Sequence, residues 1–231
     1  MKLKKIASLA LAGIMAVSML AGCTGKGNEN PGNDDPTPTT SGIAAVLNDM
    51  QTGDVKVNFT DDTALATKLQ ELVSLYGQSA NINTIKTALP KVTGLKNNSV
   101  SDDKTIDTNW NPSTCATWNN VFLNGNITYD GIFDEKKGDL TGTYTVYDIA
   151  TVGNCSTEEA AMNQFATAVI NTIKGQNLTN KCNTAGLNSG DKYYGYEYNG
   201  TAAMASVKMA DGTTDYFFVY TINQVVTEKT I

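Results

Sequence analysis

The stretch "KYYGYEYNGTAAMASVKMADGTTDYFFVYTIN" (residues 192–223) decides how we interpret the fold. It is rich in Tyr, Val, Thr and Phe, which favour strands, and it contains two pairs, Asn199-Gly200 and Asp211-Gly212, that are typical of tight turns. The pattern therefore predicts an antiparallel meander. Its three expected strands are residues 192–200, 201–209 and 214–223.

More strands are expected upstream of this meander. The segment "VKVNF" (55–59) alternates apolar and polar residues, and "GTYTVYDIATV" (142–152) is rich in Thr, Tyr and Val. In "VFLNGNITY" (121–129) the pair Asn124-Gly125 indicates a two-residue hairpin turn. We expect strands in all three segments.

Two segments show helical periodicity. In "TDDTALATKLQELVSLYG" (60–77), we expect Thr60 or Asp61 to cap the helix and Gly77 to end it. The apolar residues of this helix fall on one face: Leu65, Leu69, Leu72, Val73 and Tyr76.

The second helix is expected to begin with a capping box of Ser156 and Glu159 and to end at Lys174-Gly175. Its apolar face holds Met162, Phe165, Ala166, Val169 and Ile173. The order of these strands and helices predicts a single α+β domain over residues 43–231. We expect a mostly antiparallel sheet with helices packed on one face.

The chain begins with Lys2, Lys4 and Lys5, followed by an uncharged apolar run from Ile6 to Gly22. This pattern is typical of a secretion signal. The run ends in Leu20-Ala21-Gly22-Cys23, which resembles the lipobox of bacterial lipoproteins. The resemblance implies that residues 1–22 are a signal peptide, that Cys23 carries a lipid, and that the exported protein is anchored to the outer face of the cell membrane.

Residues 23–42 begin with Cys23, and from Thr24 onward they are mostly Gly, Asn, Asp, Pro, Thr and Ser, with no residue able to build a core. Such a composition predicts a disordered tether. A flexible coil of about 20 residues spans roughly 25 Å on average. We expect it to hold the body a short distance from the membrane.

The charge of the chain excludes some functions. The net charge is −6, and it becomes −9 once the three lysines of the signal peptide are removed. All 17 basic residues are lysine and there is no histidine. An acidic chain without arginine lacks the basic surface that binds nucleic acid, so we exclude nucleic-acid binding. Without histidine, Ser-His-Asp and Cys-His catalytic groups cannot form.

Short chemical motifs give no cofactor and no metal site. Asp107, Asn109 and Asn111 begin like a calcium loop, but Pro112 and Trp118 occupy positions that need glycine and glutamate. The segment from Ser101 to Lys104 fits S-x-x-K, but it lies in a polar loop without a K-T-G partner. We interpret both as ordinary loops.

Aromatic residues are the candidate ligand-binding groups. Tyr194, Tyr196 and Tyr198 share one face of an expected strand, and Trp110 and Trp118 lie near loops. If the tyrosine face is exposed, its rings suit sugars or a protein partner. If that face packs beneath the second helix, the tyrosines belong to the core.

Three cysteines remain in the body. The expected strand directions favour a disulfide between Cys115 and Cys182 in an oxidising compartment, with Cys155 left as a thiol near a helix start.

The sequence thus favours a membrane-anchored lipoprotein whose body is a binding or assembly module for a protein, peptide or cell-wall partner. A carbohydrate-binding accessory protein is the alternative. A small hydrolase that depends on carboxylates ranks below both. Whether the body is an enzyme stays open, and the sequence favours a protein that is not one.

Overall fold

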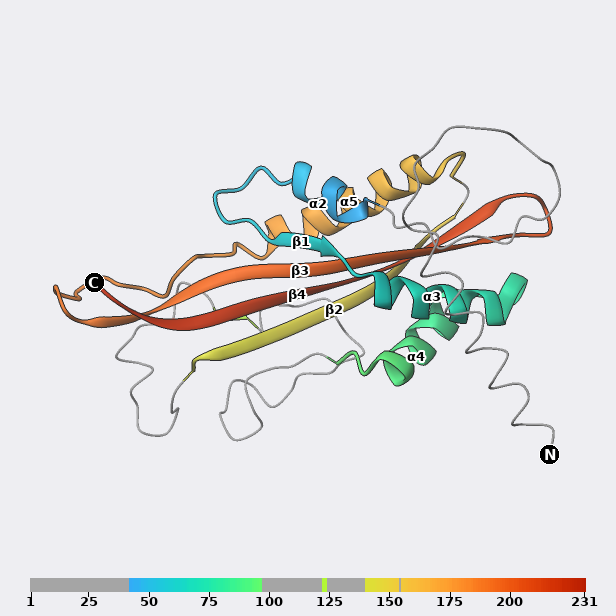
Figure 1. Cartoon of the computed structure of the whole chain (residues 1–231). Helices are drawn as coiled ribbons and strands as arrows, with labels where there is room; N and C mark the ends of the chain where they lie inside the picture. Colours follow the sequence, from blue (N-terminus) through green and yellow to red (C-terminus); the bar gives the residue numbers. More distant parts are fainter. Residues whose placement is uncertain (1–41, 97–121, 124–139, 154) are drawn as a thin grey trace, which may run out of the picture. The chain divides into compact units, whose positions relative to one another are not determined.

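The computed structural model describes residues 42–96, 122–123, 140–153 and 155–231. They form four α-helices, one short 3₁₀ helix and four strands, and the α+β class is as predicted (Figure 1). In chain order these are α2 (Ile43–Asp49), β1 (Asn58–Asp61), α3 (Thr63–Tyr76), η1 (Gly77–Ser79), α4 (Ile82–Thr93), β2 (Gly142–Val152), α5 (Glu158–Gly175), β3 (Lys192–Lys208) and β4 (Thr214–Thr230).

The four strands form one mixed sheet in the order β1-β3-β4-β2. Strands β3 and β4 pair antiparallel along their whole length, and β2 pairs antiparallel with β4. Strand β1 runs parallel to β3 at the opposite edge. The sheet is therefore antiparallel except for this short edge strand.

The turn predicted at Asn199-Gly200 was wrong, because β3 runs through it as one strand of 17 residues. Gly200 lies where β1 pairs with β3, and Phe59 is its partner in the register. A Cβ at Gly200 would lie 2.6 Å from the Phe59 ring and 2.6 Å from the Thr221 carbonyl oxygen. The glycine is therefore needed because neighbouring strands approach it closely, and it does not form a turn.

The other turn prediction is confirmed. Gly212 has a φ of 86°, and the Asp211 carboxylate accepts a hydrogen bond from the Thr213 N–H at 2.9 Å. Strand β2 also has the predicted bounds. Around Asn124-Gly125, the predicted hairpin lies outside the described residues except for Phe122 and Leu123, which are not in a strand.

Helices cover both faces of the sheet, which corrects the prediction that they pack on one face. Helices α2 and α5 contact one face, here called the α5 face, and α3 and α4 contact the other, here called the α3 face (Figure 1). On the α5 face, Phe165 stacks on Phe218 with ring centroids 4.4 Å apart. On the α3 face, Phe217 and Val219 pack with Leu69. Because both sides of β4 are apolar here, both need a cover.

Both predicted helices form, with shifted starts. Asp62, not Thr60 or Asp61, caps α3 by accepting a hydrogen bond from the Leu65 N–H. For α5, Thr157 and not Ser156 is the cap, and it accepts from the Ala160 N–H. Helices α2 and α4 were not predicted. No helix among the described residues is both long and apolar enough to cross a membrane.

Four side-chain amides each bind both the N–H and the carbonyl oxygen of one backbone residue. The pairs are Asn48 with Phe59, Gln51 with Val57, Gln70 with Ser206, and Gln224 with Leu123. Each amide thus takes the place of a neighbouring strand, and the backbone groups it binds do not stay unsatisfied. In this way Asn48 holds Phe59 of β1, and Gln51 holds Val57 just before the strand.

Candidate binding cavity

A cavity of about 520 Å³ opens between the segment that links α2 to β1 and the end of α5. Its volume lies in the range of pockets that bind small ligands. It is lined by Gln51, Thr52, Gly53, Asp54, Val55, Ile170, Ile173, Lys174, Asn177, Leu178, Thr179 and Asn180.

The lining has an apolar part and a polar part. Ile170 and Ile173 are buried side chains of α5, and Val55 and Leu178 pack against the same core. Asp54 and Lys174 are exposed and carry opposite charges, and neither has an ion-pair partner among the described residues. The cavity therefore suits a group with an apolar body and a polar or charged end.

The α2 side of the cavity is fixed by Gln51. Its side-chain oxygen accepts from the Val57 N–H at 2.8 Å, and its nitrogen donates to the Val57 carbonyl oxygen at 2.8 Å and the Leu47 carbonyl oxygen at 3.4 Å. The amide is 7% exposed. Gln51 therefore shapes the wall, and its side-chain oxygen and nitrogen are both already hydrogen-bonded to the backbone.

The opposite side holds unsatisfied polar atoms. The Thr179 hydroxyl and the side-chain oxygen of neighbouring Gln176 are buried and have no hydrogen-bond partner within the described part of the chain. A buried polar atom without a partner costs about 1–3 kcal/mol. Both atoms lie beneath the surface of the wall, so this cost belongs to the fold of the loop after α5.

A buried polar chain connects this wall to the core. The Tyr198 hydroxyl donates to the Thr179 carbonyl oxygen at 2.9 Å and accepts from the Gln224 side-chain nitrogen at 2.9 Å. Gln224 in turn binds the Leu123 backbone. Burial raises the pKa of Tyr198 to about 12, although the bonds to Gln224 and Thr179 oppose the shift. The hydroxyl therefore stays protonated and able to donate near neutral pH.

The structure places the three candidate tyrosines in the core. Tyr194, Tyr196 and Tyr198 are 2%, 2% and 6% exposed and lie on the α5 face. Burial raises the pKa of Tyr196 above its usual value. These tyrosines form no exposed platform. They belong to the core, as the second of the two alternatives held. Trp110 and Trp118, the other two candidates, lie outside the described residues.

The two described cysteines are free thiols. Cys182 is buried, and its sulfur accepts a hydrogen bond from the Tyr194 N–H at 3.3 Å. The Cys155 sulfur is half-buried and lies 3.5 Å from the Gln164 side-chain oxygen. Cys115, the predicted disulfide partner of Cys182, lies outside the described residues, as does the lipid-attachment candidate Cys23.

Sequence reasoning missed the cavity. Its polar residues lie in segments such as "QTGDV" (51–55) and "NLTN" (177–180), which have the composition of ordinary surface loops. The one local signal was the apolar face of α5, which continues to Ile173 beside these loops. Among the residues that the structure describes, no group of three or more His, Cys, Asp or Glu could hold a metal ion.

The chain matches no protein-family model, no curated protein and no solved structure.

Proposed function

We propose that this chain is an exported lipoprotein, anchored to the outer face of the cell membrane through lipid on Cys23, whose body binds a partner in the cell envelope. The lysines, the apolar run and the lipobox of residues 1–23 support the anchor. A single acyl chain binds membranes only marginally, so stable anchoring takes more than one. The diacylglyceryl group that a lipobox implies meets this need.

The cavity beside α5 is the observation that carries the binding function. It combines the apolar side chains of Ile170 and Ile173 with polar lining residues such as Asn177 and Asn180, and it has charges of both signs at Asp54 and Lys174. This combination fits an amino acid side chain together with the polar end of a peptide. We therefore favour a short peptide, or the peptide part of a larger partner, as the ligand.

The anchor is tested by labelling cells with a fatty acid. Cys23→Ala should lose the label and release the protein from the membrane fraction, because no other residue offers the lipobox thiol. Cys155→Ala, which alters a thiol in the body, serves as the matched control and should keep the label. A labelled Cys23→Ala protein would contradict the proposal.

The cavity is tested separately with the full-length protein in detergent. Tripeptides with an apolar side chain should raise its unfolding temperature, since a ligand that binds the folded state stabilises it. Lys174→Ala and Asp54→Ala should reduce this shift, whereas Lys91→Ala and Asp49→Ala, which change exposed residues outside the cavity, should not. Equal shifts in all four variants would contradict a peptide site here.

A further inference from the structure

Among the described residues, helices cover only part of the α3 face of the sheet. Helices α3 and α4 cover the part that carries Ala203, Ala205, Phe217 and Val219. Beyond them the same strands continue with polar residues. We call this part the open face, and it consists of Asn58, Thr60, Thr143, Thr145, Glu197, Asn199, Thr201, Thr221, Asn223 and Val225.

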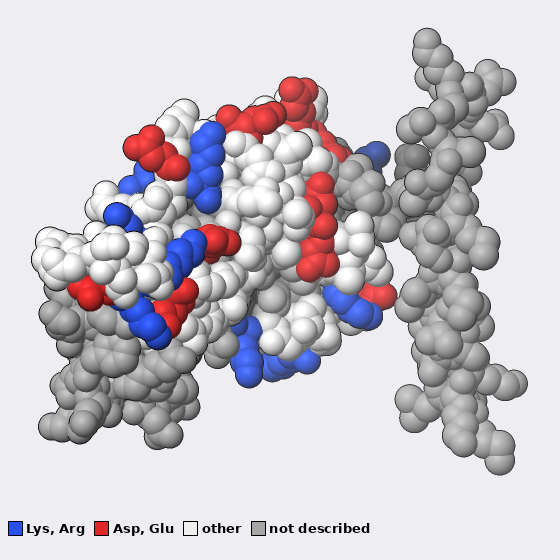
Figure 2. Space-filling view, turned by 60° about the vertical axis from the view of Figure 1, so that its left-hand side comes forward, with Lys and Arg blue, Asp and Glu red and all other residues white. Residues whose placement is uncertain are grey.

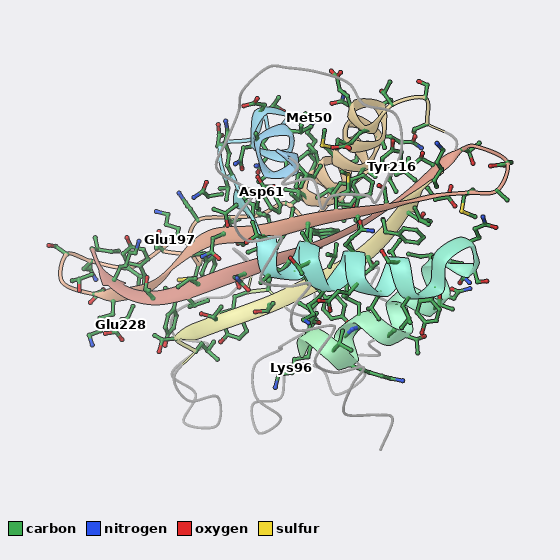
Figure 3. The ribbon with its side chains drawn as sticks, turned by 45° about the vertical axis from the view of Figure 1, so that its right-hand side comes forward. Met50, Asp61, Lys96, Glu197, Tyr216 and Glu228 are labelled. Atoms are coloured by element: carbon green, nitrogen blue, oxygen red, sulfur yellow. The ribbon has the colours of Figure 1, made fainter. Side chains whose placement is uncertain are left out.

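Several side chains of the open face reach solvent. Asn58, Thr60, Thr143, Glu197 and Asn199 are exposed, and most of the others are half-buried. The register pairs Glu197 with Val225 on the open face and Glu228 with Tyr194 on the α5 face. Figure 3 labels both glutamates at the end of the β3–β4 pair away from helices α3 and α4. The described residues 122–123 and 140 pack on the α5 side of the sheet. They therefore do not cover the open face.

The open face is ordered into rows that cross all four strands. The strand registers align Asn58 with Asn199, Asn199 with Asn223, and Asn223 with Thr145. We call these four residues the asparagine row. The adjacent row, two residues along each strand, consists of Thr60, Thr201, Thr221 and Tyr147.

Hydrogen bonds fix the asparagine row in one direction. The Thr145 hydroxyl donates to the Asn223 oxygen at 2.7 Å, and the Asn223 nitrogen donates to the Asn199 oxygen at 3.0 Å. In the described part of the chain, no partner binds the Asn199 nitrogen or the amide of Asn58. The row thus presents oriented groups that still donate and accept.

This composition is unusual for the middle of a sheet. Asparagine is depleted in strands, where it lacks the shape that packs on a pleated surface. Here three asparagines align in adjacent strands that are otherwise rich in Val, Tyr and Phe. A place where the sequence departs from its local rule is where function or strain is expected.

The charges limit what this face can bind. The asparagine and threonine rows carry no charge, and at the border Glu197 is paired with Lys229 at 3.3 Å. Figure 2 shows acidic and basic side chains intermixed on the face in view, not separated by sign. The two uncharged rows, which offer amides and hydroxyls, complement an uncharged polymer of the same groups.

The spacing of the strands points to a sugar chain. Neighbouring strands lie about 4.8 Å apart, so a chain laid across them meets one side chain of the row per step. Successive rings of a β-1,4-linked glycan face opposite ways, so groups on one side of the chain recur at every second ring, which corresponds to every second strand of the row, as at Asn58 and Asn223. Acetamido groups, like asparagine amides, both donate and accept hydrogen bonds.

We propose that the asparagine row of the open face binds an uncharged, N-acetylated β-1,4-linked glycan chain that lies across the strands. This inference rests on the proposed location outside the membrane, where such polymers occur in cell walls. It does not depend on the peptide cavity, which lies beside α5. Binding occurs through hydrogen bonds from Asn58, Asn199 and Asn223, without the stacking on tyrosine rings that the sequence suggested.

The proposal is tested by titrating the full-length protein in detergent with the hexamer of N-acetylglucosamine, in a calorimeter. The wild type should bind, and Asn199→Ala/Asn223→Ala should bind at least tenfold more weakly. Asn58→Ala, at the exposed end of the row, should weaken binding without changing the fold. Asn83→Ala/Asn171→Ala, which alters exposed helical asparagines, is the matched control and should bind like the wild type.

Cellohexaose, which has the same linkage without acetamido groups, should bind more weakly than the N-acetylated hexamer. A wild type that does not bind the N-acetylated hexamer would overturn the proposal, as would equal affinities of the wild type and both open-face variants. Equal binding of the two sugars would overturn the role of the acetamido groups. The fatty-acid labelling and the tripeptide experiment do not affect these titrations. Failure of the proposed function can therefore be distinguished from failure of glycan binding at the asparagine row.

Discussion

The covered and open parts of the α3 face use the same two strands for different purposes. Under α3 and α4 the strands carry Ala203, Phe217 and Val219, which are at most 2% exposed. A few residues further along, the same strands carry Asn199 and Asn223 at an open surface. The backbone pairing is continuous across both parts. The difference therefore lies in the side chains alone, and it separates residues that stabilise the fold from residues free to bind.

The largest expected effect is on the covered part. Phe217→Ala should lower the free energy of unfolding by about 3–5 kcal/mol, because it leaves a cavity beneath α3. A urea titration measures this change, and Leu69→Ala, on the facing helix, should cost about 2–5 kcal/mol. An unchanged urea midpoint for Phe217→Ala would show that this part of the face is not the packed core described above.

The next effect concerns Gly200, where β1 and β3 meet. Gly200→Ala places a Cβ against the Phe59 ring and the Thr221 carbonyl oxygen, so overpacking should cost about 1–3 kcal/mol. Gly195→Ala is the control, since its Cβ would meet only the flexible end of Lys229. If Asn199-Gly200 were a turn, as the sequence suggested, Gly200→Ala would not lower the free energy of unfolding more than Gly195→Ala does.

A comparable effect is expected at Gln224, on the α5 face. Gln224→Leu keeps the volume but leaves the Leu123 N–H and carbonyl oxygen without their partner, at a cost of about 1–3 kcal/mol. Gln78→Leu, at an exposed position, should change the free energy of unfolding by less than about 0.5 kcal/mol. Equal urea midpoints for these two variants would contradict the role of the buried amide.

The smallest effect on stability is expected on the open face. Asn223→Ala removes two hydrogen bonds between half-exposed side chains, and we expect a cost below about 1 kcal/mol. A urea titration beside Phe217→Ala gives the comparison directly. A cost as large as that of Phe217→Ala would mean that the asparagine row is part of the stabilising core.

Local patterns predicted much of the fold. Strand β2 and the apolar faces of α3 and α5 followed from residue type and periodicity, because each depends on neighbours within one segment. The path of β3 through Gly200 did not, since it depends on contact with Phe59 about 140 positions away in the chain. The helices on both faces were missed for the same reason: the two apolar sides of β4 need partners that only the assembled sheet identifies.

The candidate sites were less predictable than the fold. Tyr194, Tyr196 and Tyr198 form a regular row in the sequence, but alternation alone does not say which side of a strand faces helix α5. The asparagine row was invisible because Asn58, Asn199 and Asn223 are separated along the chain and come together only through the strand registers. The cavity likewise depends on two loops that meet at the end of α5.

The central claim, that the open part of the α3 face is a binding surface, is tested most directly by NMR. Side-chain amide signals of the full-length protein in detergent are followed while the hexamer of N-acetylglucosamine is added. We predict that the signals of Asn58, Asn199 and Asn223 shift, while those of Asn83 and Asn171 on the helices stay in place. Shifts confined to Asn177 and Asn180 of the cavity, with the asparagine row unchanged, would contradict the account.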